Sequence, residues 1–254
     1  MLETLSNVFT DNPLIVSFAV IGITMYISYA ISAKLTRGRI HGSAIAIILG
    51  LVLAYIGGVL TGGEKGLSDI SIFAGIGLMG GGMLRDFAII ATAFGASFTE
   101  IKKAGISGVS SLFIGVILSF IVGVAIALAF GYTDAVSLTT IGAGTATYIV
   151  GPVTGAAIGA SSEVITISIA AGLIKSILTM VGTPFIAKYI GLDNPRTAMV
   201  YGGMMGTTSG VAGGLAATDP KLVPYGAVTA TFYTGLGCLM APSILFLMTK
   251  AIFG

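Results

Sequence analysis

The stretch Thr140–Gly155, which reads TIGAGTATYIVGPVTG, decides the fold of this 254-residue chain. It places glycines, hydroxyl side chains and Pro152 inside a strongly apolar segment. Glycine in a helix interior costs about 1 kcal/mol relative to alanine, and proline also removes a backbone donor. We therefore expect the helix to break here. The stretch Gly202–Gly214, GGMMGTTSGVAGG, predicts a second break for the same reason.

The composition around these two stretches is that of an integral membrane protein. Hydrophobic residues make up 55% of the chain and charged residues only 9%, against about a quarter in ordinary soluble domains. The mean hydropathy is +1.03. Several apolar runs exceed the roughly 18 residues that mark a membrane-spanning candidate. We therefore predict an all-α, polytopic membrane protein that forms a single transmembrane domain over 1–254.

Charge and residue counts argue against several other classes. The net charge of +2 gives no basic footprint for nucleic acid. Cys238 and His41 are the only cysteine and histidine, so a disulfide framework, a zinc site and a histidine-based triad are not expected. The sequence has no P-loop or nucleophile elbow. We expect no enzyme, no catalytic residue and no bound cofactor.

Eight hydrophobic segments follow one another, and short loops between them carry most of the charge: 13–33, 41–62, 69–97, 104–131, 135–160, 163–190, 197–219 and 221–249. Glycines in 135–160 and 197–219 have two interpretations. They can pack continuous helices closely, or they can break helices that line a polar cavity, because broken backbone inside lipid needs polar partners. Two segments that each combine glycines with hydroxyls favour the second interpretation.

The distribution of basic residues favours re-entrant hairpins at both breaks. Lysine and arginine prefer cytoplasmic loops, so we place the loop after the first segment inside and the N-terminus outside. With two re-entrant hairpins, eight basic residues lie inside and two outside; with eight crossings the ratio is six to four. The inside set is Lys34, Arg37, Arg39, Lys102, Lys103, Lys188, Arg196 and Lys221. This predicts about six spanning helices and two hairpins in an inverted-repeat-like arrangement.

A weak internal similarity agrees with such a repeat. Gly155–Ser162 aligns with Ala212–Asp219 at an offset of 57 residues, and each stretch precedes an apolar helix. Within the single domain, we expect 1–131 to supply mainly scaffold. We expect 132–254 to form the moving core that binds substrate and ion.

Two basic residues lie deep within predicted segments. Arg85 is near the middle of 69–97, and Lys175 is near the centre of 163–190. Ionisable groups at that depth usually face a cavity or a partner, and an anionic substrate needs such a positive group. The alternatives are that Arg85 marks a helix end at the interface and that Lys175 forms a structural ion pair.

Hydroxyls, glycines and helix ends at the two breaks are candidates for binding an anion and a small cation. Glu163 and Asp219 follow the breaks and either bind a cation or cap the next helix, and Asp134 has the position of a cap. We assign four tyrosines to the membrane interface: Tyr148, Tyr201, Tyr225 and Tyr233. Hydroxyl donors and acceptors come from Thr145, Thr147, Thr207, Thr208 and Ser209.

Four stretches resemble the MadM subunits of the MadL/MadM malonate transporter family, and the similarity extends over essentially the whole chain: Lys34–Ser43, Leu78–Phe87, Ile141–Pro152 and Gly206–Lys221. The resemblance implies a multi-pass protein of the bacterial cytoplasmic membrane that takes up malonate with a cation, described as sodium. It also implies a MadL-like small membrane subunit as partner, with a higher oligomer as a further possibility.

The hairpins also look like those of two-hydroxycarboxylate and glutamate–sodium symporters, whose glycine-rich tips bind substrate and ion. The positions implied here are Gly142, Gly144 and Thr145 in one hairpin, and Gly206, Thr207, Thr208 and Ser209 in the other. Together with Thr147, Arg85 and Lys175 they form the predicted substrate site. Sodium is expected at Thr145, Thr208, Ser209 and Asp219.

Three alternatives to malonate symport stay open from the sequence. The chain is then a carrier of another dicarboxylate, a sodium-translocating membrane subunit of a decarboxylase complex, or a structural subunit whose partner holds the transport path. A decarboxylase subunit would need a buried acid for the ion, and this chain has few deep acids.

Overall fold

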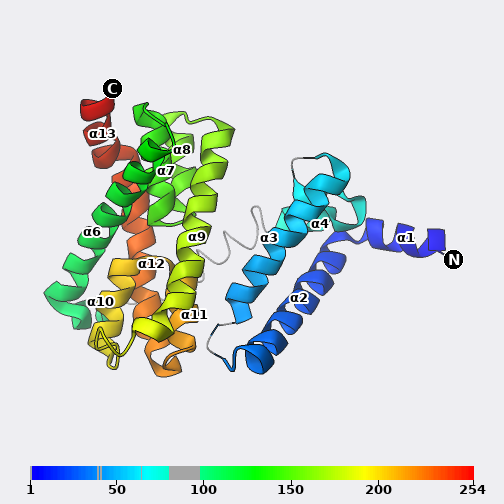
Figure 1. Cartoon of the computed structure of the whole chain (residues 1–254), viewed down its shortest axis with the longest axis horizontal. Coiled ribbons are helices and arrows are strands. Elements are labelled where there is room, and N and C mark those ends of the chain that lie inside the picture. The colour runs from blue at the N-terminus through cyan, green and yellow to red at the C-terminus, as the bar shows by residue number, and fades with distance from the viewer. Residues whose placement is uncertain (1, 39, 41, 64, 80–97) are drawn as a thin grey trace. The chain divides into compact units, whose positions relative to one another are not determined.

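The computed structural model of the chain describes residues 2–38, 40, 42–63, 65–79 and 98–254. Within these ranges the regular structure is helical, as predicted. The chain divides into two compact units, Met1–Phe94 and Gly95–Gly254 (Figure 1). Arg85, His41 and most of the third predicted segment, 69–97, lie outside the described residues.

The N-terminal unit is built on two long apolar helices that pack side by side. Gly42, at the start of the second, lies against the ring of Tyr29 on the first. Pro13 opens the first helix at a position where its missing N–H is not needed. The described helices of this unit are α1 (Leu2–Asp11), α2 (Pro13–Leu35), α3 (Gly42–Thr61), η1 (Gly66–Asp69), η2 (Ser71–Phe73) and α4 (Ala74–Leu78).

The C-terminal unit is centred on one long helix, α9 (Ser162–Ile186), which packs against α7, α8 and α11. Ser161 caps its N-terminus by accepting a hydrogen bond from the Val164 N–H. The other elements of this unit are α6 (Phe98–Ala129, with non-helical backbone at Gly105), α7 (Ala135–Ala146), α8 (Val150–Ile158), α10 (Pro195–Met205), α11 (Thr208–Ala216), η4 (Pro220–Leu222), α12 (Val223–Met240), the π-helical turn η5 (Ala241–Leu245) and α13 (Phe246–Phe253).

The first predicted break is present, and the chain turns back on itself there. Residues 147–149 separate α7 from α8, and together with Ala146, the last residue of α7, they form the first tip, where Thr147 has extended backbone. A methyl group on Gly155 of α8 would meet both Thr140 of α7 and Ile165 of α9. The two arms therefore run alongside each other, and α7 and α8 form a helical hairpin against the first half of α9 (Figure 1).

The second predicted break forms another hairpin. Gly206 and Thr207 separate α10 from α11 and form the second tip. Thr183 of α9 bonds Tyr201 of α10 and also lies against Gly214 of α11, so both arms reach the same level of α9. This hairpin packs beside the second half of α9, at the end opposite to the first hairpin (Figure 1).

Five stretches of the described chain are long and apolar enough to cross a membrane: Pro13–Leu35, Ala44–Gly77, Gly105–Ala129, Ser162–Ile186 and Pro220–Phe253. They agree with five of the six predicted spans. The predicted sixth, 69–97, falls mainly on residues that are not described. The all-α, polytopic character of the chain is thus confirmed.

Candidate functional site

The ammonium group of Lys175 lies at the middle of α9, between the two tips. Its Nζ donates hydrogen bonds to Ser119 Oγ at 2.8 Å, to the Ala146 carbonyl oxygen at 2.9 Å and to Tyr233 Oη at 3.4 Å. It also lies 5.2 Å from the centre of the Tyr233 ring. An ammonium has three N–H donors, so each of them has an oxygen partner.

Local helix geometry explains why a cation is held at this point. α7 ends at Ala146, and the last carbonyl groups of a helix lack intrahelical partners and carry partial negative charge. The Lys175 ammonium donates a hydrogen bond to one of these carbonyl oxygens, that of Ala146. Its three oxygen partners are neutral, and within the described residues no carboxylate bonds to it. The structure therefore gives no support to the ion-pair alternative for Lys175.

Tyr233 connects Lys175 to the second tip and to α6. Its side chain is fully buried, and its hydroxyl donates to the Gly115 carbonyl at 3.1 Å. Its ring lies against Gly206, which has a φ of +71°. The prediction that Tyr233 is an interfacial anchor was wrong, as it was for Tyr201, because both side chains are buried and hydrogen-bonded inside the unit.

Thr145 adds a further contact between the first hairpin and α6. Its hydroxyl lies 2.8 Å from the Ser119 carbonyl oxygen and 2.7 Å from the Gly142 carbonyl oxygen. Gly144 lies directly against the Ser168 backbone, and Thr147 is buried at the tip. Thr145 thus bonds to the backbone of a Lys175 partner and Gly144 holds the hairpin close to α9, whereas Gly142 lies against Phe120 and Val124 of α6.

The second tip meets α9 at Ser176, the residue that follows Lys175. Ser176 Oγ and Thr207 Oγ1 are 2.5 Å apart and share a hydrogen bond. Thr208 and Ser209 open α11, and Ser209 Oγ is buried without a hydrogen-bond partner in the structure. The two tips therefore reach consecutive residues of α9, Lys175 and Ser176.

The predicted acidic residues lie away from this meeting point. Asp219 is at the base of the second hairpin, where its carboxylate accepts from the Lys221 N–H at 3.0 Å, and Glu163 is exposed in the first turn of α9. Asp134 caps α7, as predicted. Partial burial works to raise the pKa of the Asp134 carboxyl, but hydrogen bonds from Ser137 prevail and keep that pKa below its ordinary value.

Sequence reasoning did not assign Ser119, Tyr233 or Ser176 to the site, and it placed Tyr233 at the membrane interface instead. Ser119 is a small polar residue in a very apolar span, and serines in membrane helices commonly bond to their own backbone, so it carries no distinctive signal. Ser176 follows Lys175 directly, and that adjacency was a usable hint. Only the tertiary contacts identify Tyr233.

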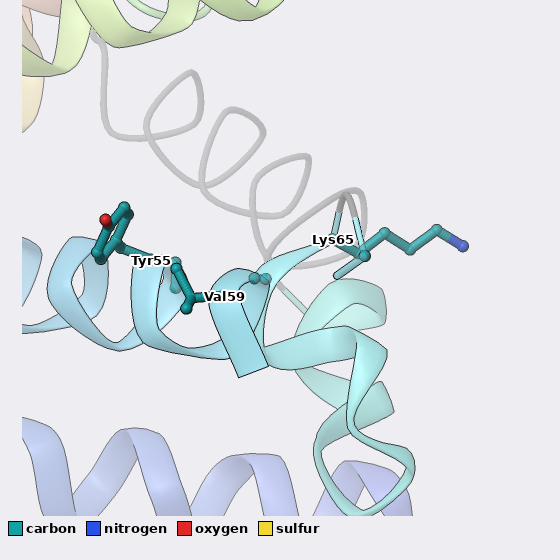
Figure 2. A pocket seen from close by; sticks show the side chains of 7 residues that line it. Tyr55, Val59 and Lys65 are labelled. Atoms are coloured by element: carbon teal, nitrogen blue, oxygen red, sulfur yellow. The ribbon is translucent and has the colours of Figure 1, made fainter. Parts of the chain in front are cut away.

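A hollow in the N-terminal unit does not contain these residues. It is an open depression of about 550 Å³ between α3 and the loop that follows it. Figure 2 shows Tyr55 and Val59 on the helix and the Lys65 side chain extending away from the hollow. The described residues that line it are mostly small or apolar, and Lys65 is the charged residue among them. The hollow is therefore not the candidate site.

The comparisons with known proteins identify one family. Its model, described as the malonate/sodium symporter MadM subunit, matches residues 5–253. No curated protein and no solved structure gave a match. Because the family match covers nearly the entire sequence, this chain belongs to the malonate/sodium symporter MadM subunit family.

Proposed function

We propose that this chain is the substrate-binding membrane subunit of a cation-coupled malonate symporter of the bacterial cytoplasmic membrane. The family description supports malonate transport, with sodium as the coupling ion and further subunits as partners. A MadL-like small membrane protein is the partner we expect. The observation that carries the site is the Lys175 ammonium, which lies between two hairpin tips with neutral oxygens as its bonding partners.

The chemistry of this site suits a dicarboxylate. Lys175 supplies a positive charge in surroundings of low polarity, where charge attraction is stronger than in water. α8 and α11 both begin at the tips, and helix N-termini attract anions. Thr145, Thr207 and Thr208 add hydroxyl donors. We place malonate between the tips, with one carboxylate at Lys175.

The arrangement of the hairpins supports alternating access. They approach the centre of α9 from opposite ends, so each covers the site from one side (Figure 1). If both hairpins are re-entrant in the bilayer, moving one tip at a time exposes the site to one side at a time. The predicted sodium ligands Thr145, Thr208 and Ser209 lie at or beside the same tips, and their role stays a prediction. Asp219, at the hairpin base, is a less central candidate.

Uptake of labelled malonate into vesicles tests this function. The vesicles contain the chain with its partner subunit, and the variants are Lys175→Ala, Thr145→Ala and Thr208→Ala. We expect Lys175→Ala to abolish uptake and each threonine variant to reduce it, by about tenfold for one hydrogen bond to a charged ligand. Lys188→Ala is the matched control, because Lys188 is exposed beyond the end of α9.

Three results would contradict the proposal. Normal malonate affinity in all three variants would remove the site. Uptake by the partner subunit alone would make this chain a structural subunit. Sodium-dependent decarboxylation without malonate uptake would favour the decarboxylase alternative.

A further inference from the structure

The three oxygens around the Lys175 ammonium form a small cation-binding cage. We define the oxygen cage as Ser119 Oγ, the Ala146 carbonyl oxygen and Tyr233 Oη, which lie 2.8, 2.9 and 3.4 Å from Nζ. They come from α6, α7 and α12, so the cage is held by three helices other than the one that carries the lysine. The backbone positions of all three cage residues are therefore set by helices other than α9.

We propose that the oxygen cage is the site of the monovalent coupling cation, and that Lys175 and this cation occupy it in turn. The inference rests on the proposed malonate site. When a substrate carboxylate draws the ammonium away, the cage is left with three oxygens directed at an empty position. A monovalent cation then takes that position, beside the substrate.

The chemistry of the cage fits a monovalent rather than a divalent ion. Its oxygens are one carbonyl and two hydroxyls, whereas calcium and magnesium sites usually include carboxylates. No cluster of three or more metal-binding side chains occurs in the described part of the chain. The partial negative charge at the end of α7 still favours a single positive charge.

Electrostatics make the two occupants mutually exclusive. Two unit charges about 4 Å apart repel each other strongly even at an effective dielectric constant of about 20. Lys175 can leave, because its side chain is a flexible four-carbon stem with a compact charge. An emptied cage leaves buried acceptors without partners, which is unfavourable for each group. Filling the cage with the coupling ion removes that cost.

This exchange couples the two solutes. Malonate favours the state in which the cage is open, and the cation binds only in that state, so each raises the affinity for the other by the same factor. A dicarboxylate, the lysine ammonium and one monovalent cation also sum to zero charge. A neutral load lowers the desolvation penalty of carrying the substrate through the membrane.

The proposal is tested by measuring sodium binding to the purified full-length transporter in detergent. Radioactive sodium reports the binding, and choline replaces sodium in the reference buffer. In the unmodified protein, saturating malonate is expected to tighten sodium binding about fivefold or more. Lys175→Met empties the cage without offering a new donor. Without malonate, this variant should bind sodium about as tightly as the unmodified protein does with saturating malonate. Adding malonate should not change its sodium affinity. Ser119→Ala added to Lys175→Met should weaken sodium binding about tenfold.

Lys188→Met is the matched control, because Lys188 also lies 5.2 Å from a tyrosine ring, that of Tyr189, but is exposed. It should leave sodium binding unchanged. Ser119→Ala alone avoids any folding defect of the lysine variant. It should reduce the factor by which sodium enhances malonate binding.

Two outcomes would overturn the cage, and both are distinct from a failure of the proposed malonate site. The cage is wrong if, in the absence of malonate, Lys175→Met binds sodium no more tightly than the unmodified protein does. The cage is also wrong if sodium enhances malonate binding in Ser119→Ala by the same factor as in the unmodified protein. Malonate binding that survives Lys175→Met would instead remove the malonate site itself.

Discussion

Lys175 shows how a charged residue is kept within an apolar helical bundle. An ionised group at that depth is costly unless each of its donors has a partner. Ser119, Ala146 and Tyr233 supply those partners from three helices. A residue that depends on three elements is sensitive to small movements of any of them. This sensitivity suits the substrate-binding role that we propose for Lys175.

Gly206 gives a prediction at the residue scale. Its φ of +71° and its contact with the Tyr233 ring both exclude a side chain. Gly206→Ala should lower the thermal midpoint and nearly abolish malonate uptake, because the ring must move away from Lys175. Gly191→Ala is the control: Gly191 has a φ of +63° with open space around it. Gly191→Ala should lower the free energy of unfolding only by the backbone strain, about 1–2 kcal/mol. Equal losses of uptake in Gly206→Ala and Gly191→Ala would contradict the role of the Tyr233 ring.

Removing the Tyr233 hydroxyl gives a second residue-scale prediction. Tyr233→Phe keeps the buried ring but deletes the donor to Gly115 and one acceptor for Lys175. We expect a loss of about 1 kcal/mol in the free energy of unfolding and a clear fall in the maximal uptake rate. Tyr189→Phe, at an exposed tyrosine, should change neither quantity. A Tyr233→Phe transporter with unaltered uptake would separate this hydroxyl from the site.

At the scale of elements, glycines let both hairpins lie directly on α9. Gly144 contacts the Ser168 backbone, and Gly210 lies against the Ser176 carbonyl and Thr207. Close packing and helix breaks are therefore both present, whereas the prediction that the breaks line a polar cavity stays a prediction. The helices break at the tips, and the arms pack closely on either side of each break. Close packing brings both tips to adjacent residues of one helix.

The contact between α9 and the first tip gives an element-scale prediction. Gly172 lies against the Tyr148 backbone nitrogen and the Gly144 carbonyl, so the methyl group of Gly172→Ala must displace the tip. We expect uptake to fall at least tenfold. Gly182→Ala, on the same helix but with nothing within 4 Å, should keep uptake and gain up to about 1 kcal/mol of helix stability. Retained uptake in Gly172→Ala would show that the tip does not need this close approach.

For the whole molecule, membrane topology is the property to test. Ser161 precedes α9, whereas Lys221 lies at the base of the second hairpin, near the opposite end of that helix. In a protein whose Cys238 is replaced by serine, single cysteines at 161 and 221 should be labelled from opposite sides, with 161 outside. Eight full crossings would put both positions inside. Labelling of both positions from one side would therefore contradict the re-entrant arrangement.

The internal similarity seen in the sequence also acquires a structural meaning at this scale. Gly155–Ser162 runs from α8, the second arm of the first hairpin, into the start of α9. Ala212–Asp219 runs from α11, the second arm of the other hairpin, to the residue that caps η4. The two aligned stretches thus occupy equivalent places. This supports a duplicated hairpin unit, although the functional division of the chain at residue 131 stays a prediction.

Composition and local pattern by themselves determined the class of the protein, the position of both helix breaks and the location of Lys175 deep within a span. Hydropathy, glycine content and a buried charge are properties of a segment and its neighbours in sequence, so they can be recognised without tertiary structure. Which oxygens meet Lys175 depended on the packing of α6, α7 and α12. Ser119 and Tyr233 lie 56 and 58 residues away from it in sequence. Only the folded unit brings such distant, locally unremarkable residues together.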